Sequence, residues 1–337
     1  MFDQVRCRFP RLIAGALLVT SIVTLCATPS VAATADAASY PTKPLRFVVT
    51  FAPGGGTDVF ARAIALKFTE AWSQSVIVDN RAGGNGNIGA DMVAKAPADG
   101  YTVLVTTNAT IVINPHLVKL PYDPVRDLAP ISQLATLPFV LLVHPSLPVK
   151  SVAELIALAK AKPGQLNFGS SGGGGGAHLS GEMMKTAAKI DMTHVPYKGA
   201  APALVALLGG EVQFMFVSIL TATPLIESNR VRAIAVSGLK RSSALPNVPA
   251  VAETPGLAGF ETDLWYGMLA PAKTDPAIVN KLYRETKRVL ERAEFKNRFE
   301  PTGTQIVANS PAEFAKIIKT DLAKWAVVIK SSGAKMD

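Results

Sequence analysis

Cysteine is nearly absent from this sequence. The 337 residues contain two cysteines, Cys7 and Cys26, and both lie before residue 37. Once this first segment is removed during export, the mature chain has no cysteine. That composition excludes a disulfide scaffold, thiol catalysis and a metal site built on cysteine.

The first 37 residues have the pattern of a secretory signal peptide rather than of folded structure. Three arginines precede an apolar run at residues 12–26, and small residues follow, so cleavage is expected after Ala37 or after Ala32. No second uncharged apolar span of about 18 residues or more occurs later in the sequence. We therefore expect an exported, periplasmic protein with roughly 300 residues left for two domains of ordinary size.

The sequence lacks the residues that several classes of ligand require. The four histidines are scattered, as are the acidic residues, so no metal site is expected. Lysine and arginine form no run and do not alternate with aromatic residues, so nucleic acid is not an expected partner. The formal net charge of +9 fits attraction of anionic ligands and fits an ordinary solvated surface equally well.

The stretch at residues 167–178, NFGSSGGGGGAH, is the most unusual in the chain. A short apolar strand is expected before it and a helix after it. Consecutive glycines are costly in backbone entropy, so this loop indicates that a ligand approaches the backbone closely. The first N–H groups of a helix have no helical partner and favour an anion. We predict a carboxylate site here, and its candidate residues are Ser170, Ser171, Gly172, Gly174 and His178.

A second loop of the same design lies at residues 53–58. Residues 45–51 predict a buried strand, the loop reads PGGGTD, and the following helix repeats apolar residues at four-residue spacing. Thr57 is expected to cap this helix, and Asp58 to lie in its first turn. Two ordinary turns would give the same pattern, but we favour a pair of ligand loops. The candidates here are Gly54, Gly55, Gly56, Thr57 and Asp58.

Residues 84–89 match the dinucleotide pattern G-x-G-x-x-G and open a predicted helix. That pattern also needs an acidic residue after the next strand, where this chain has Thr106, Thr107 and Asn108. A nicotinamide cofactor is therefore not expected, and the glycines are interpreted as a turn that lets the helix pack closely. Thr107 and Asn108 follow a strand, so they either bind a polar ligand or cap the next turn.

The loop at residues 169–173 also matches the nucleophile pattern G-x-S-x-G. A hydrolase using Ser171 would need an acid and then a histidine further along, but only His178 and His194 follow, so no credible triad exists. An enzyme is therefore not expected. His178 is disfavoured as a cation at a helix N-terminus. It is expected to be neutral and to bond a ligand oxygen or cap the loop backbone, and we favour the ligand role.

Two further strand ends carry polar residues. A strand predicted at residues 192–196 ends in Tyr197 and Lys198, and a strand at 212–217 ends in Ser218. Tyr197 offers a hydroxyl and a stacking face, whereas Lys198 is either a ligand cation or a solvated surface lysine. These three residues complete the set of candidates.

The predicted elements divide the mature chain into two α/β domains. Strands at residues 139–143 and 262–271 are expected to cross between them, and helices at 275–299 and 310–330 to pack on the first domain. The first domain is then discontinuous, comprising residues 38–139 and 263–337, and the second comprises 140–262. Trp265, in the second crossing strand, is expected either in the core or on the wall of a cleft.

Six motifs, taken together, resemble a known family. They occupy residues 41–46, 53–58, 80–90, 99–102, 169–179 and 195–199. In this combination the chain resembles, over nearly its whole mature length, the periplasmic solute receptors of tripartite tricarboxylate transporters, the Bug or TctC-like family.

This resemblance implies a type II periplasmic-binding-protein fold, with two α/β domains and a ligand cleft between them. It implies a receptor without cofactor or metal that binds a small carboxylate through loops 53–58 and 170–178, partly by backbone N–H groups and bridging water. The receptor would deliver its ligand to membrane permease subunits, and a monomer is expected. The alternatives are a periplasmic ligand sensor for a signalling partner and, with less support, a serine hydrolase using Ser171.

The sequence departs from the family pattern after residues 209–210. Where the family often has Asp-Leu-Met-Phe-Asp, this chain reads QFMFVS at residues 213–218. The loss of two acids disfavours an amino-acid ligand, because its ammonium group would need one. The expected ligand is a dicarboxylate or an aromatic carboxylate.

Overall fold

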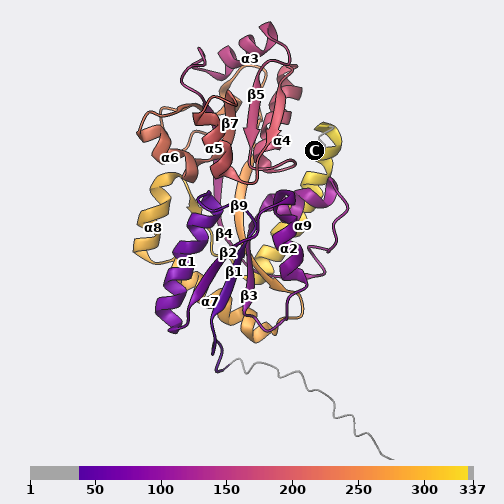
Figure 1. Cartoon of the computed structure of the whole chain (residues 1–337), viewed down its shortest axis with the longest axis vertical. Helices are drawn as coiled ribbons and strands as arrows, with labels where there is room; N and C mark the ends of the chain where they lie inside the picture. Colours follow the sequence, from indigo (N-terminus) through magenta and orange to yellow (C-terminus); the bar gives the residue numbers. More distant parts are fainter. Residues whose placement is uncertain (1–37, 333–337) are drawn as a thin grey trace, which may run out of the picture. The chain divides into compact units, whose positions relative to one another are not determined.

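The computed structural model describes residues 38–332, and the predicted signal peptide lies outside them (Figure 1). The strands in this part are β1 (Leu45–Val49), β2 (Val76–Asn80), β3 (Thr102–Thr107), β4 (Leu128–Val143), β5 (Asn167–Ser170), β6 (Thr193–Pro196), β7 (Phe214–Ser218), β8 (Arg232–Val236), β9 (Asp263–Pro271) and β10 (Gln305–Ile306). The α-helices are α1 (Gly56–Trp72), α2 (Asn87–Ala94), α3 (Val152–Ala161), α4 (Gly176–Ala188), α5 (Ala200–Leu208), α6 (Ile219–Glu227), α7 (Pro276–Leu290), α8 (Ala293–Phe299) and α9 (Pro311–Ser332).

One mixed sheet runs through these residues in the order β2-β1-β3-β9-β4-β7-β5-β6, and β8 and β10 also pair with β4. Within it, β1 is parallel to β2 and β3, and β5 is parallel to β6 and β7. The central strands β4 and β9 run antiparallel to each other and to their neighbours. Each parallel group therefore lies on its own side of the β4–β9 pair.

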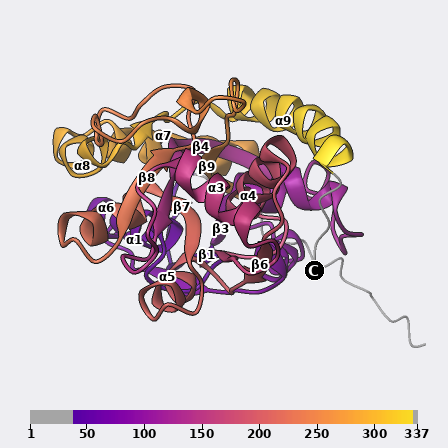
Figure 2. The same ribbon diagram turned by 90° about the horizontal axis from the view of Figure 1, so that it is seen from above.

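Two lobes follow from this pairing. The first lobe is built on β1–β3 with α1, α2 and α7–α9, and the second on β5–β8 with α3–α6 (Figure 1). Strand β4 serves both, because residues 128–138 pair with β9 whereas residues 139–143 pair with β7 and β8. Figure 2 shows α7, α8 and α9 together along one side of the β4–β9 pair, and both α7 and α9 pack on β4.

Helix α1 is fixed by its apolar face. Phe60 and Phe68, at the spacing that places residues on one side of a helix, are fully buried. The ring of Phe60 lies 5.5 Å from that of Tyr266, 5.3 Å from that of Phe295 and 4.7 Å from that of Phe299. This cluster ties the helix that begins at the first glycine loop to β9 and α8.

Three expectations about the elements were wrong. Residues 121–130 contain three prolines and were expected to form a surface connection, but β4 begins at Leu128 and accommodates Pro130 where its register against β9 shifts. The helix expected at 275–299 is two helices, α7 and α8. Thr57 does not cap α1, because the helix begins at Gly56 and Gly55 is its N-cap.

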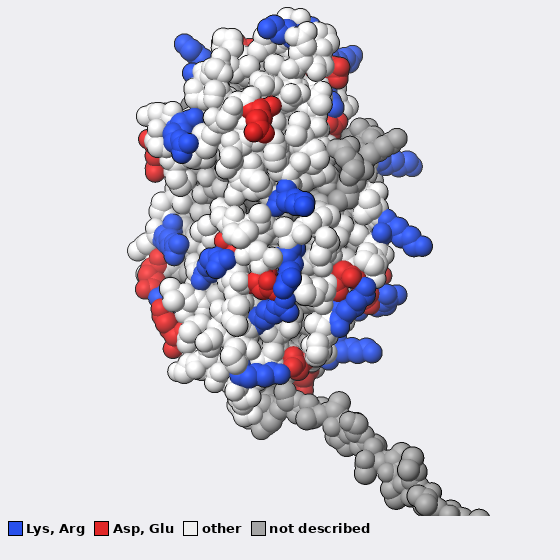
Figure 3. All heavy atoms as spheres, viewed as in Figure 1, with Lys and Arg blue, Asp and Glu red and all other residues white. Residues whose placement is uncertain are grey.

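The surface carries charges of both signs. On the face drawn in Figure 3, Lys and Arg side chains are spread over both lobes and interleaved with Asp and Glu. Lys43 pairs with Asp99, and Arg241 with Glu253, at 3.0 and 2.7 Å. Within residues 38–332, no helix is both long enough and apolar enough to cross a membrane.

The aromatic cluster around Phe60 can be tested by stability. Phe60→Ala is expected to lower the free energy of unfolding by about 3–5 kcal/mol, because a buried ring is lost and a cavity remains. Leu66→Ala, on the exposed side of the same helix, is expected to change it by less than about 0.5 kcal/mol. Urea unfolding of both variants measures the difference, and equal effects would contradict the packing described.

Candidate functional site

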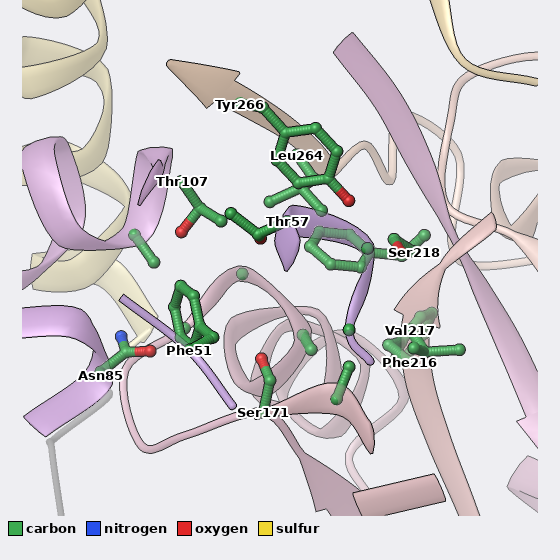
Figure 4. A pocket seen from close by; sticks show the side chains of 18 of the residues that line it. Phe51, Thr57, Asn85, Thr107, Ser171, Phe216, Val217, Ser218, Leu264 and Tyr266 are labelled. Carbon is green, nitrogen blue, oxygen red and sulfur yellow. The ribbon is translucent and has the colours of Figure 1, made fainter. Parts of the chain in front are cut away.

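A pocket lies where the carboxyl ends of β1, β3, β5 and β7 approach the central strands β4 and β9. Its volume is about 50 Å³. Thr57 and Thr107 reach it from the first lobe, and Ser171 and Ser218 from the second (Figure 4). Open α/β sheets bind ligands beyond the carboxyl ends of their strands, so both halves of the chain place the pocket where a ligand is expected.

Two helices begin at this pocket, α1 at Gly56 and α4 at Gly176. Their N-cap residues, Gly55 and Gly175, have extended backbones and no side chain that could cap the helix. The first N–H groups of a helix have no helical acceptor, and its N-terminus carries about half a positive charge. Because α1 and α4 belong to different lobes, two positive helix ends open on one pocket. This arrangement favours an anion.

The loops before these helices are fixed in the same way. In α1 the third helical residue, Asp58, accepts a hydrogen bond at Oδ2 from the Gly54 N–H, at 3.0 Å. In α4 the third helical residue, His178, accepts one at Nδ1 from the Gly174 N–H, at 2.9 Å. Each side chain reaches back as the glutamate of a capping box does, but to the residue before the N-cap. Asp58 and His178 therefore hold the loops in shape.

Asp58 is buried and ionised. Burial opposes its ionisation, but hydrogen bonds from the Arg62 side chain, the Gly54 N–H and the Asn80 side chain outweigh burial and lower its pKa below the ordinary 3.8. Arg62 Nε lies 3.0 Å from Oδ2, and Asn80 Nδ2 lies 3.0 Å from Oδ1. The guanidinium of Arg62 thus balances the Asp58 charge locally, and that charge does not oppose an anion in the pocket.

The His178 ring is held by contacts at both nitrogens and by stacking. Its Nδ1 accepts a backbone N–H and so carries no proton, while its Nε2 lies 3.6 Å from Glu182 Oε1. The ring stacks on His194, with centroids 3.8 Å apart and planes at 15°. Of the two roles considered, capping the loop backbone is the one the structure places there.

Two buried oxygens in the pocket have no hydrogen-bond partner among the described residues, Thr107 Oγ1 and Asn85 Oδ1. Their residues are 5% and 7% exposed. By contrast, Ser218 Oγ lies 2.7 Å from Thr221 Oγ1. Buried polar groups are nearly always paired, so the two free oxygens indicate a place where a ligand's polar groups belong.

The remaining lining is apolar and uncharged. Phe51, Phe139, Phe216 and Leu264 form much of the wall, and Tyr266 adds a buried ring (Figure 4). Burial raises the pKa of Tyr266, so its hydroxyl stays protonated. Among residues 38–332, those that line the pocket include no Lys, Arg, His, Asp or Glu. The helix ends are therefore its main source of positive potential.

Six of the predicted site residues line the pocket. They come from both glycine loops and from the ends of β3 and β7, and they are Gly55, Gly56, Thr57, Thr107, Ser171 and Ser218. Residues of both glycine loops therefore line one pocket, and their contact with a ligand stays a prediction.

Nine predicted residues do not line it. Four belong to the loop-fixing pairs just described, namely Gly54, Asp58, Gly174 and His178. The other five are engaged elsewhere or face solvent. Ser170 Oγ bonds the Gly172 carbonyl oxygen and His194, and Gly172 itself lies against the Asn85 side chain. Asn108 Nδ2 donates to the Asp263 carbonyl, Tyr197 lies 3.5 Å from Glu211, and Lys198 is exposed.

Sequence reasoning missed Asn85 and the aromatic wall. Asn85 lies in the G-x-G-x-x-G turn, which was interpreted only as a packing device. Trp265 was considered for the cleft wall, but its indole Nε1 donates to Asp321, at 2.8 Å, and it is Tyr266 that lines the pocket. Neighbouring residues of a strand point to opposite faces, so the choice between these two depended on the partner strands.

The role of Asp58 predicts a pH-dependent stability. In Asp58→Asn the amide nitrogen would face a donor, so the variant is expected to lose about 1–3 kcal/mol of unfolding free energy at pH 7. Because the folded-state pKa of Asp58 is lowered, the wild-type advantage is full above about pH 4 and disappears as the pH falls through that lower value. Urea unfolding from pH 7 to pH 3 measures this.

Glu291→Gln is the matched control. Glu291, the C-cap residue of α7, is half exposed and lies 3.7 Å from Lys287 of that helix, and such pairs contribute about 0–1 kcal/mol. A loss for Asp58→Asn that equals the control at pH 7, or that persists unchanged at pH 3, would contradict the role of Asp58 in fixing the loop.

Known proteins are similar to this chain in both sequence and fold. Three solved structures match closely: Rpa4515 of R. palustris with adipate is 37% identical, covering 88% of this chain and 99% of that one, with a TM-score of 0.85. The periplasmic binding protein BugD is 32% identical over 88% and 100% of the chains, with a TM-score of 0.84. MatC of Rhodopseudomonas palustris with bound malate is 30% identical over 86% and 100%, with a TM-score of 0.81.

These neighbours confirm the predicted fold, a two-domain α/β periplasmic-binding-protein architecture. The family described as "Tripartite tricarboxylate transporter family receptor", TctC, matches residues 60–334. The match spans most of the chain and agrees with the resemblance drawn from the motifs. The chain belongs to the TctC family of tripartite tricarboxylate transporter receptors.

Proposed function

We propose that this protein is a periplasmic solute receptor that binds a small carboxylate between its two lobes. Its ligand would pass to the membrane components of a tripartite tricarboxylate-type transporter. The family is one of receptors, and a receptor needs converging donors rather than a nucleophile and a base. The protein is therefore a receptor and not an enzyme, and the hydrolase alternative for Ser171 is not favoured.

One observation carries the proposal. The N-termini of α1 and α4, from different lobes, open on one pocket whose described lining has no charged side chain. An anion is the ligand that such N–H groups favour. The adipate of Rpa4515 and the malate of MatC are both carboxylates, and this chain is at least 30% identical to each protein. We propose that Gly55, Gly56, Thr57, Thr107, Ser171 and Ser218 contact the ligand.

Domain boundaries follow from the same proposal. The lobes would correspond to residues 38–139 with 263–337 and to residues 140–262, joined through β4 and β9. A backbone hydrogen bond crosses between them, from the Ala52 N–H to the Lys198 carbonyl, at 3.3 Å. We infer that this contact belongs to a closed form, that the receptor acts as a monomer in the periplasm, and that closure is what permease subunits recognise.

Ligand binding can be measured directly by thermal shift and calorimetry with a panel of acids. The panel includes adipate, malate, succinate and benzoate, each compared with its uncharged amide. A ligand present at about 100 times its dissociation constant is expected to add about 2.7 kcal/mol of stability. Amides are expected to have no effect, because they carry no negative charge for the helix ends. If no acid stabilises the protein, the carboxylate receptor is not its function.

The helix-end site predicts the effect of a side chain at Gly55. Its backbone is extended (φ −77°, ψ 165°) and an added Cβ would lie no closer than 3.7 Å to another atom, so Gly55→Val is expected to fold. Its side chain would cover the N–H groups of α1, and affinity for the best acid is expected to fall at least about 100-fold by loss of charge-assisted hydrogen bonds. Calorimetry measures this loss.

Gly209→Val is the matched control for Gly55→Val. Gly209 ends α5, is exposed and has φ −80°, so valine is tolerated there and affinity is expected to stay unchanged. Wild-type affinity in a folded Gly55→Val protein would contradict ligand contact at the start of α1.

A further inference from the structure

Asn85 occupies an unusual place in the pocket. It lies in the short turn between β2 and α2, with φ 51° and ψ 40°, a left-handed conformation that asparagine tolerates better than most residues. The residue is only 7% exposed, and it lines the pocket. Figure 4 shows its oxygen on the side of the pocket and its nitrogen turned away.

Neighbouring side chains fix which way its amide points. Asn114 Nδ2 donates to the Asn85 backbone carbonyl at 3.0 Å and to Asn87 Oδ1 at 2.7 Å, so the Asn114 side-chain oxygen faces the other way. That oxygen accepts from Asn85 Nδ2 at 2.8 Å. A backbone carbonyl can only accept, so this chain of contacts has one orientation. Asn85 Oδ1 is left as an acceptor directed at the pocket, without a partner among the described residues.

The second lobe makes room for this oxygen. A Cβ atom at Gly172 would lie 3.0 Å from Asn85 Oδ1, and a Cβ atom at Gly175 would lie 3.1 Å from it. Both distances are shorter than most Cβ contacts, so a side chain at either position would press on the Asn85 amide. The two glycines thus allow a first-lobe acceptor to reach the loop before α4, beside the helix end that favours the anion.

The helix-end N–H groups and the Asn85 side-chain oxygen would bind different parts of one ligand. The helix ends supply N–H donors for a carboxylate, whereas Asn85 Oδ1 supplies only an acceptor. An ammonium group would lack a counter-charge, because no acidic residue is among the described residues of the lining. A neutral donor on the ligand body, such as a hydroxyl, meets both conditions. Thr107 Oγ1, the other free oxygen in this pocket, can accept or donate to the same group.

We propose that Asn85 is a specificity residue that accepts a hydrogen bond from a hydroxyl group on the ligand, so that the receptor selects hydroxylated carboxylates over their unsubstituted counterparts. This inference rests on the proposed function, because it assumes that a carboxylate occupies the pocket. It adds the chemical class that the pocket distinguishes and the residue that makes the distinction.

The experiment compares pairs of acids that differ by one hydroxyl group. Suitable pairs are succinate with each enantiomer of malate, butyrate with each enantiomer of 3-hydroxybutyrate, and benzoate with 3- and 4-hydroxybenzoate. Calorimetry on the wild-type protein is expected to give about tenfold or tighter binding of the hydroxylated member in at least one pair, because the unsubstituted acid leaves a buried acceptor unpaired. This comparison requires no substitution.

Asn85→Gly then tests the residue. Glycine adopts the left-handed conformation readily, and the change removes the acceptor while keeping the turn. The preference for the hydroxylated acid is expected to fall to within about twofold, through the loss of that single hydrogen bond. Asn229→Gly is the matched control, since Asn229 also has a positive φ (55°) but is exposed and outside the pocket lining. It is expected to retain the wild-type preference.

The outcomes separate the two proposals. Binding of acids with no hydroxyl preference in any pair would overturn the role of Asn85 and leave the carboxylate receptor standing. A preference that survives Asn85→Gly would likewise overturn it. Failure of every acid to bind would overturn the proposed function and this inference together.

Discussion

The close approach of two helix N-termini is the constraint on which the rest of the structure depends. Both α1 and α4 open on one pocket, so their partial positive charges add where a ligand is expected. Glycine permits the approach: a Cβ atom at Gly176 would lie 2.8 Å from the Phe139 ring, and one at Gly175 would lie 3.1 Å from the Asn85 side chain. The glycine run is thus needed for close packing against the other lobe and against the central strand β4, in addition to any role in ligand access.

The two loops reach the same shape by different chemistry. In the first lobe the loop N–H is held by a carboxylate, Asp58, whose charge Arg62 balances. In the second it is held by an imidazole nitrogen, Nδ1 of His178, whose ring stacks on His194. Neither solution leaves an uncompensated negative charge beside the helix ends. The positive potential of both N-termini is therefore preserved, although one of the loops contains an acid.

The sequence was informative where structure is local. The succession of strand, glycine loop and helix could be predicted on both sides of the pocket, because each such pattern is contained in about fifteen consecutive residues. Which loop residues line the pocket and which hold the loop in shape could not be predicted. Asp58 and His178 differ from the lining residues only in where their side chains point after folding. Asn85 was missed for the same reason: its orientation depends on Asn114, which lies 29 residues away in the chain.

Under the proposed function, a pocket whose described lining is uncharged would make recognition depend on closure of the two lobes. Helix-end effects fall off within the first turn, and hydrogen bonds weaken steeply with distance and misalignment. A ligand on one lobe alone would meet one helix end. On closure it would gain the second helix end, and Asn85 would lie beside Gly172 and Gly175 as it does in this structure. The free energy that favours closure is the difference in ligand contacts between the two forms. Under the proposed function, the contacts that select the ligand are therefore also the contacts that close the receptor.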